Sequence, residues 1–122
     1  MAHSLVWVEN NPIVTFEGNL DFEGINDANN AIIGDARFDR MKFQLFDHTR
    51  VTWMYLTERE SKLISILDTN SSIWNQYVKV ALVFSNESYI QYVQAYVQAM
   101  KLSKWDVRVF LSYQEAYDWC IG

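Results

Sequence analysis

The sequence predicts a single α/β domain over residues 1–122, with a five-stranded mixed sheet that opens with a hairpin and continues with parallel strands. Strand-like and helix-like segments alternate after the first two strands, which is typical of a parallel sheet with crossover helices. Half of the 122 residues are hydrophobic, enough for one core in a chain of this length. Neither a linker nor an internal repeat divides the sequence.

Two short β-rich runs at residues 5–9 and 13–17 flank a turn cluster at 10–12, and together they predict the antiparallel hairpin. Apolar residues then recur at helical spacing over residues 21–33, and Gly34 supplies a stop signal. The chain therefore opens with two strands and a helix.

Three more strands are predicted at residues 41–47, 77–84 and 106–111, with a loop over 48–56. The helices between and after them have their own start signals. A capping box at 57–60 opens a helix that is expected to bury Leu63, Ile66 and Leu67. The longest helix is expected at 89–102, after Ser85 as N-cap, and a second capping box at 112–115 opens the last one, with Cys120 on its inner stripe.

The helices are expected mainly on one face of the sheet, because right-handed crossovers between neighbouring strands put every helix on the same side. The strands alternate in polarity, which indicates that the other face is uncovered. That face is either an ordinary solvated surface or an interface for a protein partner or a second copy of the chain. Its expected residues are Lys42, Gln44, Phe46, Lys79, Val83, Arg108 and Phe110.

Four segments give the chain a resemblance to the SpoIIAA-like (STAS/CRAL-TRIO-related) family of small bacterial proteins. They are VTFEG at 14–18, FQLFD at 43–47, KVALVF at 79–84 and VRVFLSYQEAYDW at 107–119, and the likeness covers nearly the whole chain. The most specific part is the last one, in which a strand ending in Phe leads through a short turn to Glu-Ala-x-x-Trp. The resemblance implies a βα superhelix with consecutive strands side by side.

The resemblance also implies two functions. In anti-sigma-factor antagonists with the STAS fold, a Ser at the start of the helix after the third strand is phosphorylated. The corresponding stretch here is Tyr55-Leu56-Thr57-Glu58, which lacks the acid, one hydroxyl and the glycine of the Asp-Ser-Ser-Gly pattern. Thr57 is thus a candidate phosphoacceptor, or a plain N-cap, since Glu58 and Glu60 would repel a phosphate there.

Lipid-transfer relatives enclose an apolar ligand, and an aromatic-rich set could line such a pocket between the second and third helices. The alternative for this set is ordinary core packing. Its members are Trp53, Met54, Tyr55, Tyr89, Tyr92 and Tyr96.

The sequence offers little chemistry for catalysis. Asp47 and His48 are the one neighbouring acid-base pair, but adjacent strand residues point to opposite faces. The two histidines lack metal-ligand spacing, and Cys120 is expected to be a small core residue. No metal, cofactor or catalytic residue is predicted. The net charge of −5 argues against nucleic-acid binding, and the longest apolar run is too short to span a membrane.

These observations favour a non-enzymatic protein-interaction or regulatory module in the cytoplasm, acting on a protein partner or as a homodimer. The alternative is a carrier or sensor of a small apolar, lipid-like ligand. An enzyme is the third hypothesis, with His48 as its candidate residue.

Overall fold

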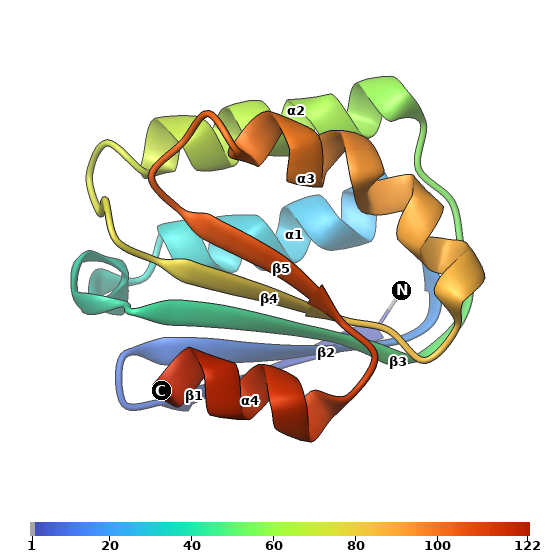
Figure 1. Cartoon of the computed structure of the whole chain (residues 1–122), viewed down its shortest axis with the longest axis horizontal. Helices are drawn as coiled ribbons and strands as arrows, with labels where there is room; N and C mark the ends of the chain where they lie inside the picture. The colour runs from blue at the N-terminus through green and yellow to red at the C-terminus, as the bar shows by residue number, and fades with distance from the viewer. Residues whose placement is uncertain (1) are drawn as a thin grey trace.

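A computed structural model describes residues 2–122, and its five strands form one sheet in the order β1-β2-β3-β4-β5 (Figure 1). β1 pairs antiparallel with β2, and all later neighbours are parallel. The predicted mixed sheet with strands in chain order is therefore confirmed. The strands are β1 Ala2–Val8, β2 Asn11–Leu20, β3 Phe43–Met54, β4 Lys79–Val83 and β5 Asp106–Phe110.

Three of the four α-helices cover one face of the sheet, as expected, and the fourth lies on the opposite face (Figure 1). The first three are α1 Phe22–Ile33, α2 Glu58–Ser71 and α3 Gln94–Met100, and α4 is Tyr113–Ile121. Two 3₁₀ segments precede β3 and α3, namely η1 Ala36–Arg40 and η2 Glu87–Val93. None of the helices among residues 2–122 has the length and hydropathy to cross a membrane.

The expectation of a bare second face was wrong, because α4 packs on β3, β4 and β5 from that side. It forms a second, smaller core there, with Phe43, Leu45 and Val83 of the sheet buried against Ala116 and Cys120. The handedness rule for crossovers did not apply to α4, since no strand follows it.

The side-chain alternation of β3 is also opposite to the expected one. Phe43 and Leu45 face α4, whereas Gln44 and Phe46 are buried on the side of α1, α2 and α3. Both faces of this central strand are covered, so its apolar pattern could not say which face held the larger core. The Oε1 atom of Gln44 has no hydrogen-bond partner within residues 2–122.

β3 is much longer than predicted, because residues 48–54, expected as loop, continue the strand. Only Phe43–Asp47 pairs with β4, while the second half pairs with β2 up to Met54. On the other side of that half, side chains take the place of a neighbouring strand. The hydroxyl of Tyr89 donates to the carbonyl of Thr52 at 2.9 Å, and the Ser85 hydroxyl donates to that of Thr49 at 3.2 Å.

The helix α2 buries a different stripe from the expected one. Leu63 and Ile66 are exposed, at 42% and 57%, whereas Ser61, Ser65 and Asp68 are buried. These small or hydrogen-bonded side chains follow helical spacing, and they allow α3 to approach α2 closely. The backbone N–H of Tyr96 in α3 donates to the Ser61 hydroxyl at 3.0 Å.

Two smaller differences concern local geometry. The long helix expected at 89–102 is η2 followed by the short α3, with Asn86 rather than Ser85 at its N-cap. The hairpin turn lies at residues 9–10, and Asn11 already belongs to β2. The Asn11 Oδ1 accepts the backbone N–H groups of Lys42 and Phe43, which ties the hairpin to the start of β3.

Candidate functional site

An open groove lies between the start of α2 and the η2–α3 segment. Its volume is about 580 Å³. Residues 55–57 follow β3 directly, so the groove lies at the carboxyl ends of the parallel strands. This is the usual place for ligands in open α/β sheets. The lining residues are Tyr55, Leu56, Thr57, Glu58, Ser61, Gln91, Tyr92, Gln94, Ala95 and Gln98.

Aromatic side chains form the mouth of this groove. The Trp53 and Tyr55 rings stack at 6.4 Å between centroids, and the Tyr55 and Tyr92 rings lie 5.6 Å apart. Trp53 and Tyr55 are about half exposed. Glu58 is the one charged residue among the lining residues, and the rest of the polar surface comes from amides and hydroxyls. The groove is thus suited to a neutral surface with both apolar and hydrogen-bonding groups.

Thr57 lies at the edge of the groove as the N-cap of α2, and the predicted capping box is confirmed. Its hydroxyl accepts the Glu60 N–H at 3.0 Å, and the Glu60 carboxylate accepts the Thr57 N–H at 3.0 Å. Two backbone donors that the helix leaves unpaired are thereby satisfied. Thr57 is exposed, with Glu58 and Glu60 in the same turn.

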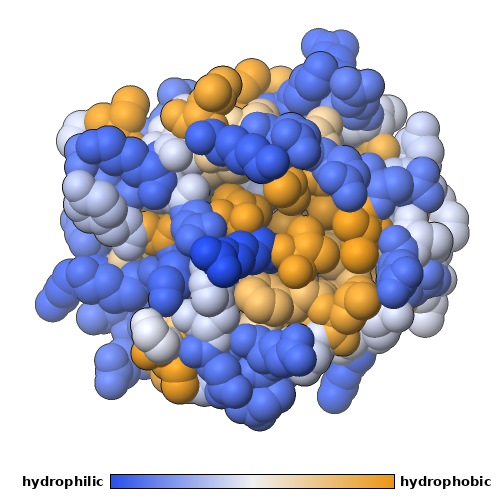
Figure 2. All heavy atoms as spheres, viewed as in Figure 1, coloured by the Kyte–Doolittle hydropathy of each residue, from blue (hydrophilic) through white to orange (hydrophobic). Residues whose placement is uncertain are grey.

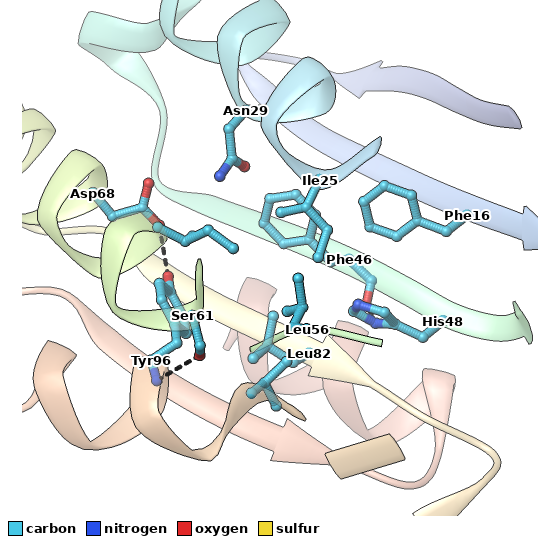
Figure 3. Close-up of a pocket in the computed structure, with 12 residues that line it drawn as sticks. Phe16, Ile25, Asn29, Phe46, His48, Leu56, Ser61, Asp68, Leu82 and Tyr96 are labelled. Carbon is cyan, nitrogen blue, oxygen red and sulfur yellow. Dashed lines mark hydrogen bonds between the residues drawn. The ribbon is translucent and has the colours of Figure 1, made fainter. Parts of the chain in front are cut away.

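Beneath the groove lies a small buried cavity of about 40 Å³, which shares Leu56 and Ser61 with it (Figure 3). This volume has room for about one to three water molecules and is far smaller than a pocket for a lipid-sized ligand. The other lining residues, from the sheet and the three helices above it, are Phe16, Ile25, Asn29, Phe46, His48, Ile64, Asp68, Leu82, Val93 and Tyr96.

One end of the cavity is polar. The Tyr96 hydroxyl donates to Asp68 Oδ2 at 2.6 Å, and both side chains are buried. Burial raises the pKa of Asp68 to about 7, although the Tyr96 hydrogen bond acts in the opposite direction. The pKa of Tyr96 is raised by burial and by the Asp68 carboxylate. Asn29 is 5% exposed and extends from α1 into the space beside Asp68 (Figure 3).

His48 lies at the other end of the cavity. Its Nδ1 is 3.2 Å from the carbonyl oxygen of Phe46 and 3.1 Å from that of Val83, so this nitrogen carries the proton and donates. The imidazole stacks on the Phe84 ring at 4.2 Å. Burial lowers the pKa of His48 to about 4, and the ring is therefore neutral at physiological pH. These contacts make His48 a connector between β3 and β4.

The comparison with solved structures bears on the fold. The chain is similar to an uncharacterised protein of the DUF3478 family from Shewanella loihica PV-4, described as having a SpoIIAA-like fold. The TM-score is 0.57 at 13% sequence identity, and the match covers 98% of this chain and 92% of that one. This chain has a SpoIIAA-like fold. No family model matches the sequence, and no curated protein matches it.

The SpoIIAA-like fold does not gather the six predicted pocket residues into one site. Tyr55 and Tyr92 line the groove, whereas Tyr96 lines the cavity. Met54 belongs to the core, and Tyr89 covers the free side of β3. Trp53 stacks on Tyr55 outside both spaces.

The expected interface residues do not form one open surface on the SpoIIAA-like sheet. Gln44 and Phe46 lie buried on the opposite face from the others, and Val83 is covered by α4. Three more of the expected interface residues contact the α4 segment. The Lys79 Nζ donates to the carbonyls of Trp119 and Gly122, the Arg108 guanidinium lies 5.0 Å from the Trp119 ring centroid, and the Phe110 ring lies 5.4 Å from it. Lys42 is exposed.

Other candidate residues of the SpoIIAA-like domain are easily placed. Cys120 is buried, as expected of a core residue, and burial raises its pKa to about 11. Asp47 accepts the backbone N–H of Thr49 at 2.9 Å, while His48 points into the main core, so the two do not converge. Within residues 2–122, no group of three or more His, Cys, Asp or Glu side chains could hold a metal ion.

Sequence reasoning missed Asn29, Ser61 and Asp68 as buried polar residues. A signal for two of them was present, since Ser61, Ser65 and Asp68 recur at i, i+4 and i+7 in the predicted helix. A polar stripe of this kind is normally taken for the solvent-facing side of a helix. This holds especially when another face carries apolar residues such as Leu63 and Ile66, which then look like the buried side.

Proposed function

We propose that this protein is a non-enzymatic protein-interaction module that holds part of a partner protein in the groove between α2 and the η2–α3 segment. The observation that carries the proposal is the contact of Tyr55 with Tyr92, 5.6 Å apart at the mouth of the groove. Exposed Tyr and Trp side chains provide much of the contact area in protein interfaces, because they bury large surfaces at a small entropy cost.

The chemistry of the groove supports a neutral peptide segment as its occupant. Gln91, Gln94 and Gln98 project from η2 and α3, and each amide can both donate to and accept from a peptide backbone. The absence of a Lys or Arg among the lining residues, which lie entirely within 2–122, disfavours a phosphate-bearing partner.

The test compares one double variant and one single variant with the wild type by affinity capture from cells of the native host, with quantitative mass spectrometry. Tyr55→Ala with Tyr92→Ala removes the mouth of the groove. Tyr77→Ala is the matched control, since Tyr77 is 72% exposed and lies outside the groove. We expect one protein to bind the wild type and the control and to fall about tenfold or more with the double variant. Equal recovery with all three proteins would refute the groove as the binding site.

Phosphorylation of Thr57 would regulate this module by breaking the contact between the partner protein and the groove. A phosphate there has to share the first turn of α2 with Glu58 and Glu60, and it would displace the Glu60 carboxylate from the capping box. We infer that the phosphorylated form releases the partner. Mass spectrometry of protein from the native host measures the modification, and an unmodified Thr57 in growing and in starved cells would remove this part of the proposal.

The cavity favours a second candidate function, the binding of a small apolar ligand. Its walls are mostly apolar, and it shares Leu56 and Ser61 with the groove, so a ligand would enter from the groove side. A lipid-like molecule requires α2 and α3 to move apart, since the cavity holds only about 40 Å³. Native mass spectrometry of the purified protein tests this, with a co-purifying apolar ligand as the supporting result and a bare chain as the contrary one.

A further inference from the structure

The outer edge of β5 is open. β5 ends the strand order, so β4 is its one neighbour in the sheet formed by residues 2–122. In the view of Figure 1, β5 lies at the front with α3 above it and α4 below it. The same view in Figure 2 shows hydrophobic residues gathered in a hollow at the centre of this face. An exposed strand edge is a template for pairing with another chain.

Two hydrogen bonds show which backbone groups of β5 are free. The Asp106 N–H donates to the Val78 carbonyl at 3.0 Å, and the Phe110 carbonyl accepts the Phe84 N–H at 2.9 Å. In a strand, the N–H and C=O of one residue point to the same side, and successive residues alternate. Since Asp106 and Phe110 face β4, the backbone groups of Val107 and Val109 face outward.

The side chains around this edge combine apolar and charged groups. A groove of about 280 Å³ lies between α3 and β5, and Val97 and Val107 line it. Both valines are half-buried, whereas Leu102, just after α3, is 92% exposed. On the other face of β5, Asp106 and Arg108 are exposed and form an ion pair at 3.3 Å. The Arg108 guanidinium also lies over the Trp119 ring.

We propose that β5 pairs antiparallel with β5 of a second copy of this chain, around a two-fold axis at Val107. The two Val107 residues then exchange both of their outward backbone hydrogen bonds. Asp106 comes opposite Arg108 of the partner subunit, and this pair occurs twice. Asp106 and the partner's Arg108 form a pair without backbone hydrogen bonds between them. In antiparallel strands the side chains of such a pair lie closer together than those of a hydrogen-bonded pair.

The charge pattern selects this register. A two-fold axis at Arg108 places two guanidinium groups opposite each other, and like charges directly across a strand pair are destabilising. An axis at Val109 leaves Asp106 opposite a serine and Arg108 opposite a phenylalanine. All three axes bring outward-facing valines opposite each other, but only the axis at Val107 places both charges of β5 opposite a charge of the other sign. This surface is separate from the Tyr55–Tyr92 groove, so the two proposals can fail independently.

The test is a charge swap followed by sedimentation velocity over a range of concentrations at low salt. Asp106→Arg puts two positive charges on β5, and Arg108→Asp puts two negative charges there. Each variant alone sets like charges opposite each other, and we expect its dimer dissociation constant to rise about tenfold or more. An equimolar mixture pairs opposite charges at all four positions, and we expect it to regain wild-type association.

Glu17→Arg and Arg50→Glu are matched controls, since this exposed pair makes an ion pair at 3.1 Å on β2 and β3, away from β5. Circular dichroism checks that every variant is folded. A wild type that stays monomeric at the highest concentration would overturn the proposal. Variants that dimerise like the wild type, or a mixture that stays monomeric, would overturn the register at Val107.

Discussion

Tyr96 in α3 donates its hydroxyl to Asp68 in α2 at 2.6 Å, which joins the two helices inside the molecule by a side-chain hydrogen bond. Both residues are buried, and Asn29 lines the cavity beside them. Burial raises the pKa of Asp68 to about 7, so its proton is lost and gained near physiological pH. A group that titrates inside a core couples folding stability to pH.

Asp68 makes the folded protein less stable as the pH rises. Its folded pKa of about 7 is above the unfolded value of about 3.9, so the folded state holds an extra proton between these values. The contribution of Asp68 to the free energy of unfolding is fully present below about pH 4. It is lost as the pH rises to 7, which lowers the free energy of unfolding by up to about 4 kcal/mol. We expect Asp68→Asn to remove this loss in urea titrations at pH 4 to 8.

The control for this prediction is Asp27→Asn, which removes one exposed carboxylate from α1. It should leave the pH dependence of the wild type unchanged. If Asp68→Asn and the wild type lose stability equally between pH 4 and 7, Asp68 is ionised in the folded protein and the Tyr96 bond is made to a carboxylate.

His48 has the opposite effect on stability. Its folded pKa of about 4 is below the unfolded value of about 6.5, so the unfolded state binds the proton first. The contribution of the neutral His48 ring to the free energy of unfolding is fully present above about pH 6.5. It is lost as the pH falls to 4, which lowers the free energy of unfolding by up to about 3 kcal/mol. We expect His48→Gln to lower stability at neutral pH but to flatten this acid loss. An imidazole that titrates near pH 6.5 by NMR would contradict it.

The sequence predicted the order of the strands well, because the hairpin and each parallel strand carry local signals. It failed for the second half of β3, since the side that lacks a neighbouring strand is covered by Ser85 and Tyr89 from a distant segment. It also failed to predict which face of the sheet α4 covers. The side of β4 that carries Ala81 and Val83 is compatible with either a covered or an open face.

The candidate site could be predicted only in part. Thr57 and Tyr92 were found because a capping box and an aromatic spacing are local patterns. The Tyr96–Asp68 bond joins residues 28 positions apart, and no local pattern reports such a pair. The exposed Leu63 and Ile66 made the wrong face of α2 look like the buried one.

Thr57→Ala should lower the free energy of unfolding by about 1 kcal/mol, because the Glu60 N–H loses its acceptor and the capping box opens. Thr57→Ser keeps the hydroxyl and should cost a few tenths of a kcal/mol at most. Urea titration measures both. Equal losses in the two variants would mean that the methyl group of Thr57, rather than its hydroxyl, supports the start of α2.

Lys79 holds the end of α4 on the sheet. Its Nζ donates to the carbonyls of Trp119 and Gly122 at 2.8 and 3.1 Å, which satisfies acceptors that the helix end leaves unpaired. We expect Lys79→Met, which keeps most of the aliphatic chain, to destabilise the protein by about 1 to 2 kcal/mol. Amide hydrogen exchange should become faster at the end of α4 and stay unchanged in α1.

The matched control is Lys42→Met, which removes an exposed lysine just before β3 that makes no side-chain hydrogen bond or ion pair within residues 2–122. It should leave stability and exchange at the wild-type level, since a single exposed charge contributes little. If Lys79→Met resembles Lys42→Met, the apolar contacts of Ala116 and Cys120 hold α4 by themselves. The Lys79 bonds would then be a consequence of the docked helix rather than a cause of it.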